Sequence, residues 1–437
     1  MSQGTASRPG MRNVLAGVPR AGRLLLLGVA VDALGTGLTL PFLVVYFREV
    51  RHIPLPTVGL LMALPPFVAL VLLGPIGLAI DRFGARRLQM VALTFSLLGQ
   101  FALIAVRGPG TAALALMLGG IGHATFFPAI GALVATAIPS EHRQRFYGLS
   151  FTLLNAGIGM GGVVSGLFVD VHRPWTFEVI YLCDGLTYLI PLVLLAFVIR
   201  GVGRPVRLHE DDGSAHVPAS YGLVLRDKAF RRFLAVTFVG AFIGYAQLEA
   251  GWTAFARIVG GISTTGIGIA FAANTAVIVL LQLPVVRRIE GHRRTRLLML
   301  MAVIWAVAWA IVGVAGLVGG AVAFALLVAS AAIFGGGETL NSPVVPAVVN
   351  DLSSDHLRGR YNAANSIAFQ IAAVLGPVSA GLLIGHGLSA AYIVMLLAGS
   401  AVLMVLLLTL ESRISPAANG VRPSVQTADR SSDEQLD

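Results

Sequence analysis

The chain has 437 residues, of which 56% are hydrophobic and only 12% are charged, and its formal net charge is +10. A soluble globular protein carries roughly 25% charged residues, so this composition excludes an ordinary water-facing surface. The single cysteine excludes an internal disulfide framework and a cysteine-based zinc site. The basic residues stand between long apolar runs, which favours membrane topology over binding of nucleic acid.

Twelve apolar runs are long enough to cross a bilayer. A hydrocarbon core about 30 Å thick needs roughly 20 apolar residues in a helix, and a helix satisfies its own backbone groups in lipid. The runs fall near 24–46, 58–80, 89–106, 111–137, 148–169, 176–199, 233–256, 265–286, 297–317, 319–349, 361–385 and 388–410. The sequence therefore predicts an all-α membrane protein with twelve transmembrane helices.

Polarity divides the chain into four predicted parts. A bundle of six helices with a short N-terminal segment covers 1–199, and a polar linker covers 200–232. A second bundle of six helices covers 233–411, and a disordered tail covers 412–437. The basic end of the linker, 226–232, is expected to form a short helix on the membrane surface.

The basic residues predict the orientation of the spans. With the N-terminus inside, only five of the 31 Lys and Arg residues fall on the outer side, namely Arg48, Arg51, Arg107, Arg173 and Arg257. Cytoplasmic loops of membrane proteins carry an excess of Lys and Arg. We therefore expect both termini in the cytoplasm of a bacterium, with the spans in its plasma membrane.

The two predicted bundles resemble each other in sequence. A shift of 207 residues aligns Gly84 with Gly291, and a shift of 215 aligns Pro128 with Pro343. Parallel repeats of this kind place a substrate site near the bilayer midplane, between the halves. Rocking of one half against the other would then expose that site to each side in turn.

The loop after the second run carries a specific motif. Residues 77–87 read GLAIDRFGARR, and this stretch resembles the G-x-L-a-D-R-x-G-R-[KR] signature of the major facilitator superfamily. The resemblance implies two pseudo-symmetric six-helix bundles and a latch on the inner side in which Asp81 takes part. The residues assigned to this inner gate motif are Gly77, Asp81, Arg82, Gly84, Arg86 and Arg87.

Shorter stretches resemble the twelve-helix drug/proton antiporter branch of this superfamily. Residues 337–343 read GETLNSP and are similar to multidrug exporters in which the glutamate is a proton and cation site. By this resemblance Glu338 takes that role, and Asn341 lies in the same stretch. Residues 157–162 resemble the G-P-x-x-G-G motif of exporters, without its proline.

Several ionisable residues lie well inside predicted spans, namely Asp32, His123, Asp184, Glu249 and Glu338. Such residues are costly in lipid and usually face an internal cavity. Glu338 is interpreted either as a proton carrier or as a neutral carboxyl that hydrogen-bonds a neighbouring helix. Asp32 is interpreted either as a proton carrier or as a residue that supports a kink in its helix. His123 suits a proton relay, a substrate contact or a structural role. Glu249 suits gating or rim solvation over binding, and Asp184 is read as structural.

These observations predict a secondary transporter that exports small lipophilic or cationic compounds. Its expected energy source is the proton gradient, with no cofactor and no metal site, and its expected partners are substrate, protons and the lipid bilayer. We expect a monomer that binds no nucleic acid. The alternative is a uniporter or a proton symporter for a sugar, an organic acid or another metabolite. A membrane enzyme is not expected, because no active-site cluster is visible.

Overall fold

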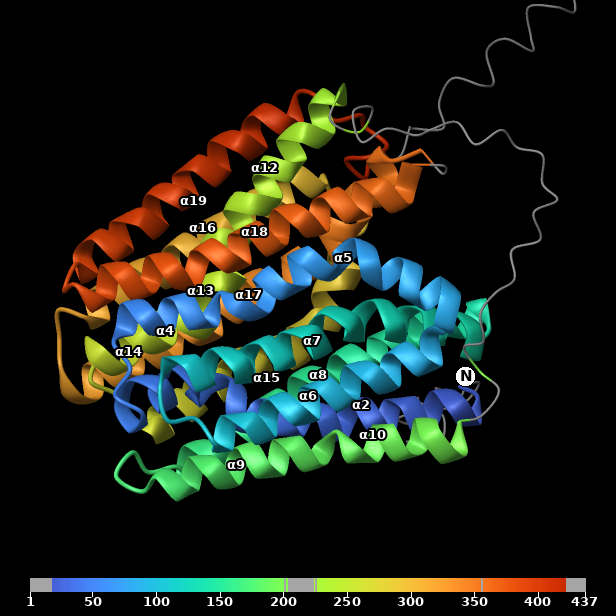
Figure 1. Ribbon diagram of the computed structural model, residues 1–437. Helices are drawn as coiled ribbons and strands as arrows, with labels where there is room; N and C mark the ends of the chain where they lie inside the picture. The colour runs from blue at the N-terminus through green and yellow to red at the C-terminus, as the bar shows by residue number, and fades with distance from the viewer. Residues whose placement is uncertain (1–17, 200–201, 203–223, 225, 355–356, 422–437) are drawn as a thin grey trace, which may run out of the picture.

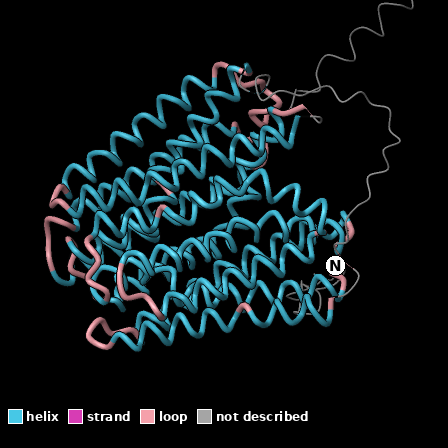
Figure 2. The backbone as a smooth tube through the Cα atoms, in the orientation of Figure 1, coloured by secondary structure: helices cyan, strands magenta, loops and turns pink. Residues whose placement is uncertain are grey.

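The computed structural model describes residues 18–199, 202, 224, 226–354 and 357–421 of the chain. These residues contain twelve helices that are long and apolar enough to cross a membrane, which confirms the predicted number. Helices account for nearly all of the described chain, and short loops join them (Figure 2). The predicted linker falls mostly outside the described residues, as do 1–17 and 422–437.

The first six spans form one bundle (Figure 1). Its elements are α2 (Arg20–Thr39), η1 (Leu40–Phe42), α3 (Leu43–Val45), η2 (Tyr46–Val50), α4 (Leu55–Met62), α5 (Leu64–Phe83), α6 (Ala85–Ile104), α7 (Pro109–Ala137), α8 (Ser140–Phe168), α9 (Pro174–Thr187), α10 (Leu189–Val193) and η3 (Leu194–Val198). Prolines at the first position of α7 and α9 fit helix starts, where the missing N–H group has no helical partner.

The last six spans form the second bundle. Its elements are α12 (Lys228–Ile243), α13 (Tyr245–Gln247), η4 (Leu248–Trp252), α14 (Thr253–Ile258), α15 (Thr264–Ile289), α16 (Arg294–Ala315), α17 (Gly320–Leu352), α18 (Arg358–Gly385) and α19 (Ser389–Glu411). Stacked aromatic rings fill its core, where the rings of Trp305 and Phe334 lie 4.8 Å apart. Trp305 also donates to the carbonyl of Phe334, which satisfies its buried N–H group.

Two segments differ in structure from what the sequence predicts. Residues 228–232 form the first turn of α12 and not a separate surface helix, because the Asp227 carboxylate caps the amides of Ala229 and Phe230. The start of the predicted tail is ordered as well. The Asn419 side chain accepts from the backbone and the hydroxyl of Thr295, so the tail satisfies amides at the start of α16.

Small residues allow close contact between helices of the first bundle. The motif at 157–162 lies on α8, where Gly157 and Gly161 face α2 and Gly159 faces α15. A Cβ atom on Gly157 would come within 2.6 Å of the Ala33 side chain, so only glycine fits there. The exporter-like motif therefore packs two helices backbone to backbone, as small residues do in membrane proteins.

The two bundles meet at one end of the molecule. We name this the Glu49 end, and we name the opposite end, where α5 finishes, the Asp81 end. In Figure 1 the bundles approach each other near α4 and α14 and separate toward the end that carries the N-terminus. The contacts between bundles run mainly through α8 with α15 and through α4 with α18.

Candidate functional site

Glu338 and Asn341 lie on α17 and belong to a polar cluster inside the second bundle. The half-buried carboxyl of Glu338 accepts a hydrogen bond from the Asn274 amide of α15 at 3.3 Å. The Asn341 amide lies 3.5 Å from the hydroxyl of Tyr245 on α13. Tyr245 and Glu249 lie close enough to the Glu338 carboxyl for charge on these groups to be felt between them. Four elements, α13, η4, α15 and α17, thus bring these groups together.

Glycines before Glu338 let α17 approach its neighbours. A Cβ atom on Gly335 would lie 2.7 Å from the backbone oxygen of Asn274, and one on Gly337 would collide with the indole of Trp305. The Asn274 amide is held further by a 3.1 Å bond to the carbonyl of Ala331. The GGGE stretch therefore fixes the helix spacing that puts the Glu338 carboxyl within reach of Asn274.

The seventh span is irregular where it reaches this cluster. Helix α12 ends at Ile243, and Gly244 (φ −99°, ψ −110°) turns the chain into the short helix α13. The π-helix η4 follows and carries Glu249, whose side chain is exposed. Single π-turns inside helices occur often at functional sites. This irregularity is what directs Tyr245 and Glu249 toward one region.

Asp32 and His123 lie in the other bundle. Asp32 of α2 lines a cavity within the first bundle together with Gln89 of α6. His123 of α7 is exposed, and its ring packs edge-on against Phe127 at 5.4 Å. Asp184 is fully buried on α9 and accepts from the hydroxyl of Thr39 at 2.7 Å. The structure thus places Glu338, Asn341 and Glu249 in the second bundle, and Asp32, His123 and Asp184 in the first.

The GLAIDRFGARR motif forms the turn between α5 and α6. Gly84 has φ +87°, a conformation that glycine adopts without strain. Arg86 donates to the carbonyls of Leu195 and Ala196 at 2.8 and 3.0 Å, so it ties α6 to the end of the sixth span. Asp81 is exposed and has no hydrogen bond or ion pair among the residues that the structure describes. The predicted latch is not engaged here.

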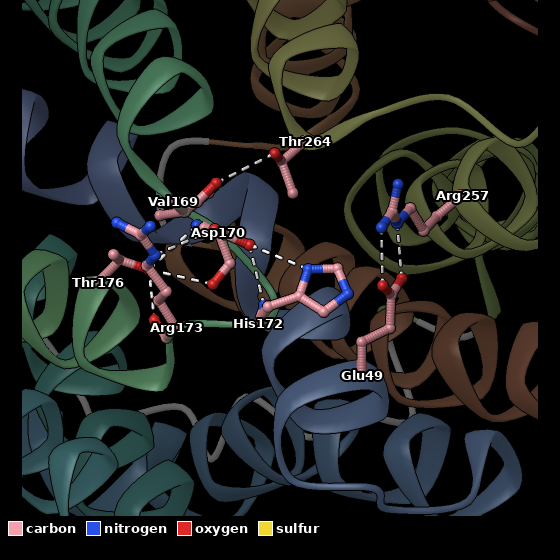
Figure 3. Close-up of polar contacts among 8 residues, drawn as sticks. All are labelled: Glu49, Val169, Asp170, His172, Arg173, Thr176, Arg257 and Thr264. Carbon is pink, nitrogen blue, oxygen red and sulfur yellow. Dashed lines mark hydrogen bonds and ion pairs between the residues drawn. The ribbon is translucent and has the colours of Figure 1, made fainter.

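The opposite end carries polar contacts between the bundles (Figure 3). Arg257 at the end of α14 holds Glu49 of η2 through two bonds of 2.6 and 2.8 Å. The hydroxyl of Thr265 donates to the carbonyl of Gly166 at 2.7 Å. Within the described residues, every hydrogen bond between the bundles lies at this end. The structure is therefore closed at the Glu49 end.

The loop beside this closed end contains a second acidic group. Asp170 accepts from the backbone N–H of His172 at 2.9 Å, and its other oxygen lies 3.6 Å from Arg173 (Figure 3). The bond from the His172 backbone, together with the nearby His172 ring and Arg173, holds the pKa of Asp170 below its usual value. This carboxylate organises the loop between α8 and α9.

Two members of the cluster, Tyr245 and Asn274, were missed at the sequence level. A signal existed for each. Asn274 is a polar residue in the middle of the apolar run 265–286, and Tyr245 follows a glycine inside the run 233–256. Neither type is rare enough in a membrane helix to mark a site without its spatial partners.

Comparisons with known proteins agree with this architecture. The sequence profile of the Major Facilitator Superfamily matches residues 25–260 and 238–431. The chain is 22% identical to a Na⁺, Li⁺, K⁺/H⁺ antiporter of Planococcus maritimus, over 81% of this chain and 87% of that protein. It is 24% identical to the multidrug resistance protein MdtH of Aeromonas hydrophila, over 84% and 89% of the two chains.

A solved structure shows the same fold. A POT family transporter, crystallised with a thioalcohol-conjugated peptide, superposes with a TM-score of 0.75. The match covers 92% of this chain and 97% of the other at 14% identity. The family match spans nearly all of the twelve helices and both bundles, so this chain is a multi-pass membrane protein that belongs to the Major Facilitator Superfamily.

Proposed function

We propose that this protein exports small lipophilic or cationic compounds in exchange for protons, by alternating access to a site between its two bundles. The observation that carries the proposal is the Glu338 carboxyl, half-buried beside Asn274 and close to Tyr245 and Glu249. A carboxylate in such a place can hold a proton or a cationic group but not both. That competition would couple release of substrate to entry of a proton.

Two further observations support the proposal. Relatives with this architecture are named as a multidrug resistance protein and as a cation/proton antiporter. The closed Glu49 end, and an Asp81 that has no partner among the described residues, fit one state of a rocking cycle. We place the Asp81 end and both termini in the cytoplasm of a bacterium, because the Lys and Arg residues gather on that side.

The test is transport in everted membrane vesicles from cells that lack their main exporters. Vesicles that contain the wild-type protein are energised with a pH gradient, and accumulation of a fluorescent lipophilic cation such as ethidium is followed. We expect Glu338→Gln to lower gradient-driven accumulation to the background of empty vesicles. An uncoupler should have the same effect on the wild type.

A matched variant controls for loss of a carboxylate as such. Glu290 lies exposed just after α15, outside the cluster, and Glu290→Gln should transport like the wild type. Gradient-driven transport that survives Glu338→Gln would contradict the proposal. Proton-driven uptake of a sugar or an organic acid into intact cells would favour the alternative, a symporter.

A further inference from the structure

A line of buried polar side chains runs through the first bundle. It begins in a cavity of about 20 Å³ between α2, α6, α7 and α10, which has room for one water molecule. The walls are apolar apart from Asp32 and Gln89. Asp32 Oδ1 and Gln89 Oε1 are both buried without a hydrogen-bond partner in the described chain, and Gln89 is only 2% exposed. Two such acceptors match the two hydrogens of one water.

The cavity lies on the Asp81 side of Asp32. Its lining includes Leu24 and Leu25 near the start of α2 and Ile199 just after η3. Asp32 follows the start of α2 by 12 residues, which corresponds to roughly 18 Å along a helix. The cavity therefore lies between the Asp81 end and a carboxyl near mid-membrane, within one bundle.

A second carboxyl, that of Asp184, follows along this line. Asp184 Oδ2 accepts from Thr39, while its Oδ1 is buried and has no partner within the described residues. Gly35 lies one helical turn after Asp32 on α2, and a Cβ atom on Gly35 would come within 2.5 Å of Asp184 Oδ1, so the Asp184 carboxyl packs against the face of α2 that carries Asp32. The Tyr188 hydroxyl lies close enough to both carboxyls for their charges to act on it.

Tyrosines continue the line toward the Glu49 end. Tyr181 is fully buried, its hydroxyl has no partner in the described part of the chain, and its ring lies 4.9 Å from that of Tyr46. The Tyr46 hydroxyl accepts from Arg51 at 2.9 Å. At the other end of the line, the basic group is Arg86 of α6, which donates to the carbonyl of the cavity-lining Leu195. The neighbouring helices bring apolar groups to this region. Helix α8 packs against α2 through glycines and Ile158, and α7 contributes Phe126 to the cavity wall. No salt bridge to Asp32 or Asp184 occurs among the described residues.

We propose that Asp32 and Asp184 form a proton-binding site inside the first bundle, which is filled from the Asp81 end through a water held at Gln89. Two buried carboxylates without a basic partner would repel each other, and one shared proton leaves a single charge on the pair. Transfer between them breaks one O–H bond and forms another, with the Tyr188 hydroxyl or a water as carrier. The use of this proton in transport rests on the function proposed above, whereas its binding does not.

The test is infrared difference spectroscopy of the purified full-length protein in lipid nanodiscs, between mildly alkaline and mildly acidic buffer. The C=O stretch of a protonated carboxyl is followed, so no substrate is required. We expect a band component that is missing from Asp32→Asn/Asp184→Asn and present in Glu338→Gln. Thr39→Val, which keeps both carboxyls, should shift that component because Asp184 loses its donor. Gln89→Leu should slow its exchange in D₂O.

The outcomes separate this proposal from the transport proposal. A full band in the double Asn variant, or its loss in Glu338→Gln, would overturn the assignment even if Glu338 proves essential for transport. Loss of the component when choline chloride is replaced by NaCl would identify a metal-cation site and overturn the proton assignment. Unchanged D₂O exchange in Gln89→Leu would overturn the route through the cavity.

Discussion

Replacing Arg257 with glutamine removes the ion pair that joins the two bundles at the Glu49 end. Arg257 holds both carboxylate oxygens of Glu49, at 2.6 and 2.8 Å, and the two side chains are 22% and 26% exposed. The pair exists only while this end is closed, because its members sit on different bundles. Its loss should therefore shift the protein toward states that open at the Glu49 end.

The size of this shift follows from the geometry of the pair. Exposed ion pairs contribute ~0.2–1 kcal/mol, and hydrogen bonds to charged groups contribute ~1.5–3 kcal/mol. The Arg257 and Glu49 side chains are about a quarter exposed and so lie between these two cases. We therefore expect the pair to stabilise the closed state by about 1–2 kcal/mol. That corresponds to roughly a 5- to 30-fold gain in the population open at the Glu49 end.

The assay is labelling of one engineered cysteine from outside intact cells. Cys183→Ser removes the single native cysteine, and Ala254→Cys then places a thiol in a small buried gap between α4, α14 and α18. With the Glu49 end facing outward, as proposed above, a membrane-impermeant maleimide should reach this thiol only when that end opens. We expect Arg257→Gln and Glu49→Gln each to raise the labelling rate by the factor above. The double variant should add little to either.

A comparable ion pair within one bundle provides the control. Arg51 and Glu178 lie 2.9 Å apart and both belong to the first bundle, so Glu178→Gln should leave the labelling rate unchanged. An unchanged rate in both Arg257→Gln and Glu49→Gln, or an equal rise in Glu178→Gln, would refute the reasoning.

Two further predictions concern stability. The pKa of the Asp170 carboxyl is lowered mainly by the hydrogen bond from the His172 backbone amide. The ionised carboxylate therefore stabilises the folded protein at any pH above the usual aspartate pKa of about 3.9. This stabilisation is lost as the pH falls through the lower pKa of the folded state. Asp170→Asn should therefore make thermal unfolding, followed by tryptophan fluorescence in detergent, less sensitive to acid, and an unchanged acid dependence would contradict this. Gly84→Ala should destabilise the protein by about 1 kcal/mol because φ is +87°, whereas Gly77→Ala, which meets no atom within 4 Å, should not. Equal unfolding midpoints for the two variants would count against the argument.

Most of the fold could be predicted from local chemistry. A stretch of roughly 20 apolar residues has few alternatives to a helix in lipid, so the twelve runs and their connections follow from composition alone. The turn between α5 and α6 could be predicted as well, because Gly84 and the basic residues after it form a distinct pattern. The start of α12 and the docked tail could not, because they depend on Asp227 and Asn419 finding backbone amides that only the folded chain presents.

The candidate site, like the fold, could be predicted from the sequence only in part. By itself the sequence determined which ionisable residues lie in the membrane, since a charge in an apolar run is conspicuous. Only the tertiary structure decided their partners: Glu338 lies with Asn274 and Tyr245, whereas Asp32 turns into its own bundle toward Gln89. The reason is that depth in the membrane follows from position along a helix, while the direction of a side chain depends on how neighbouring helices pack around it.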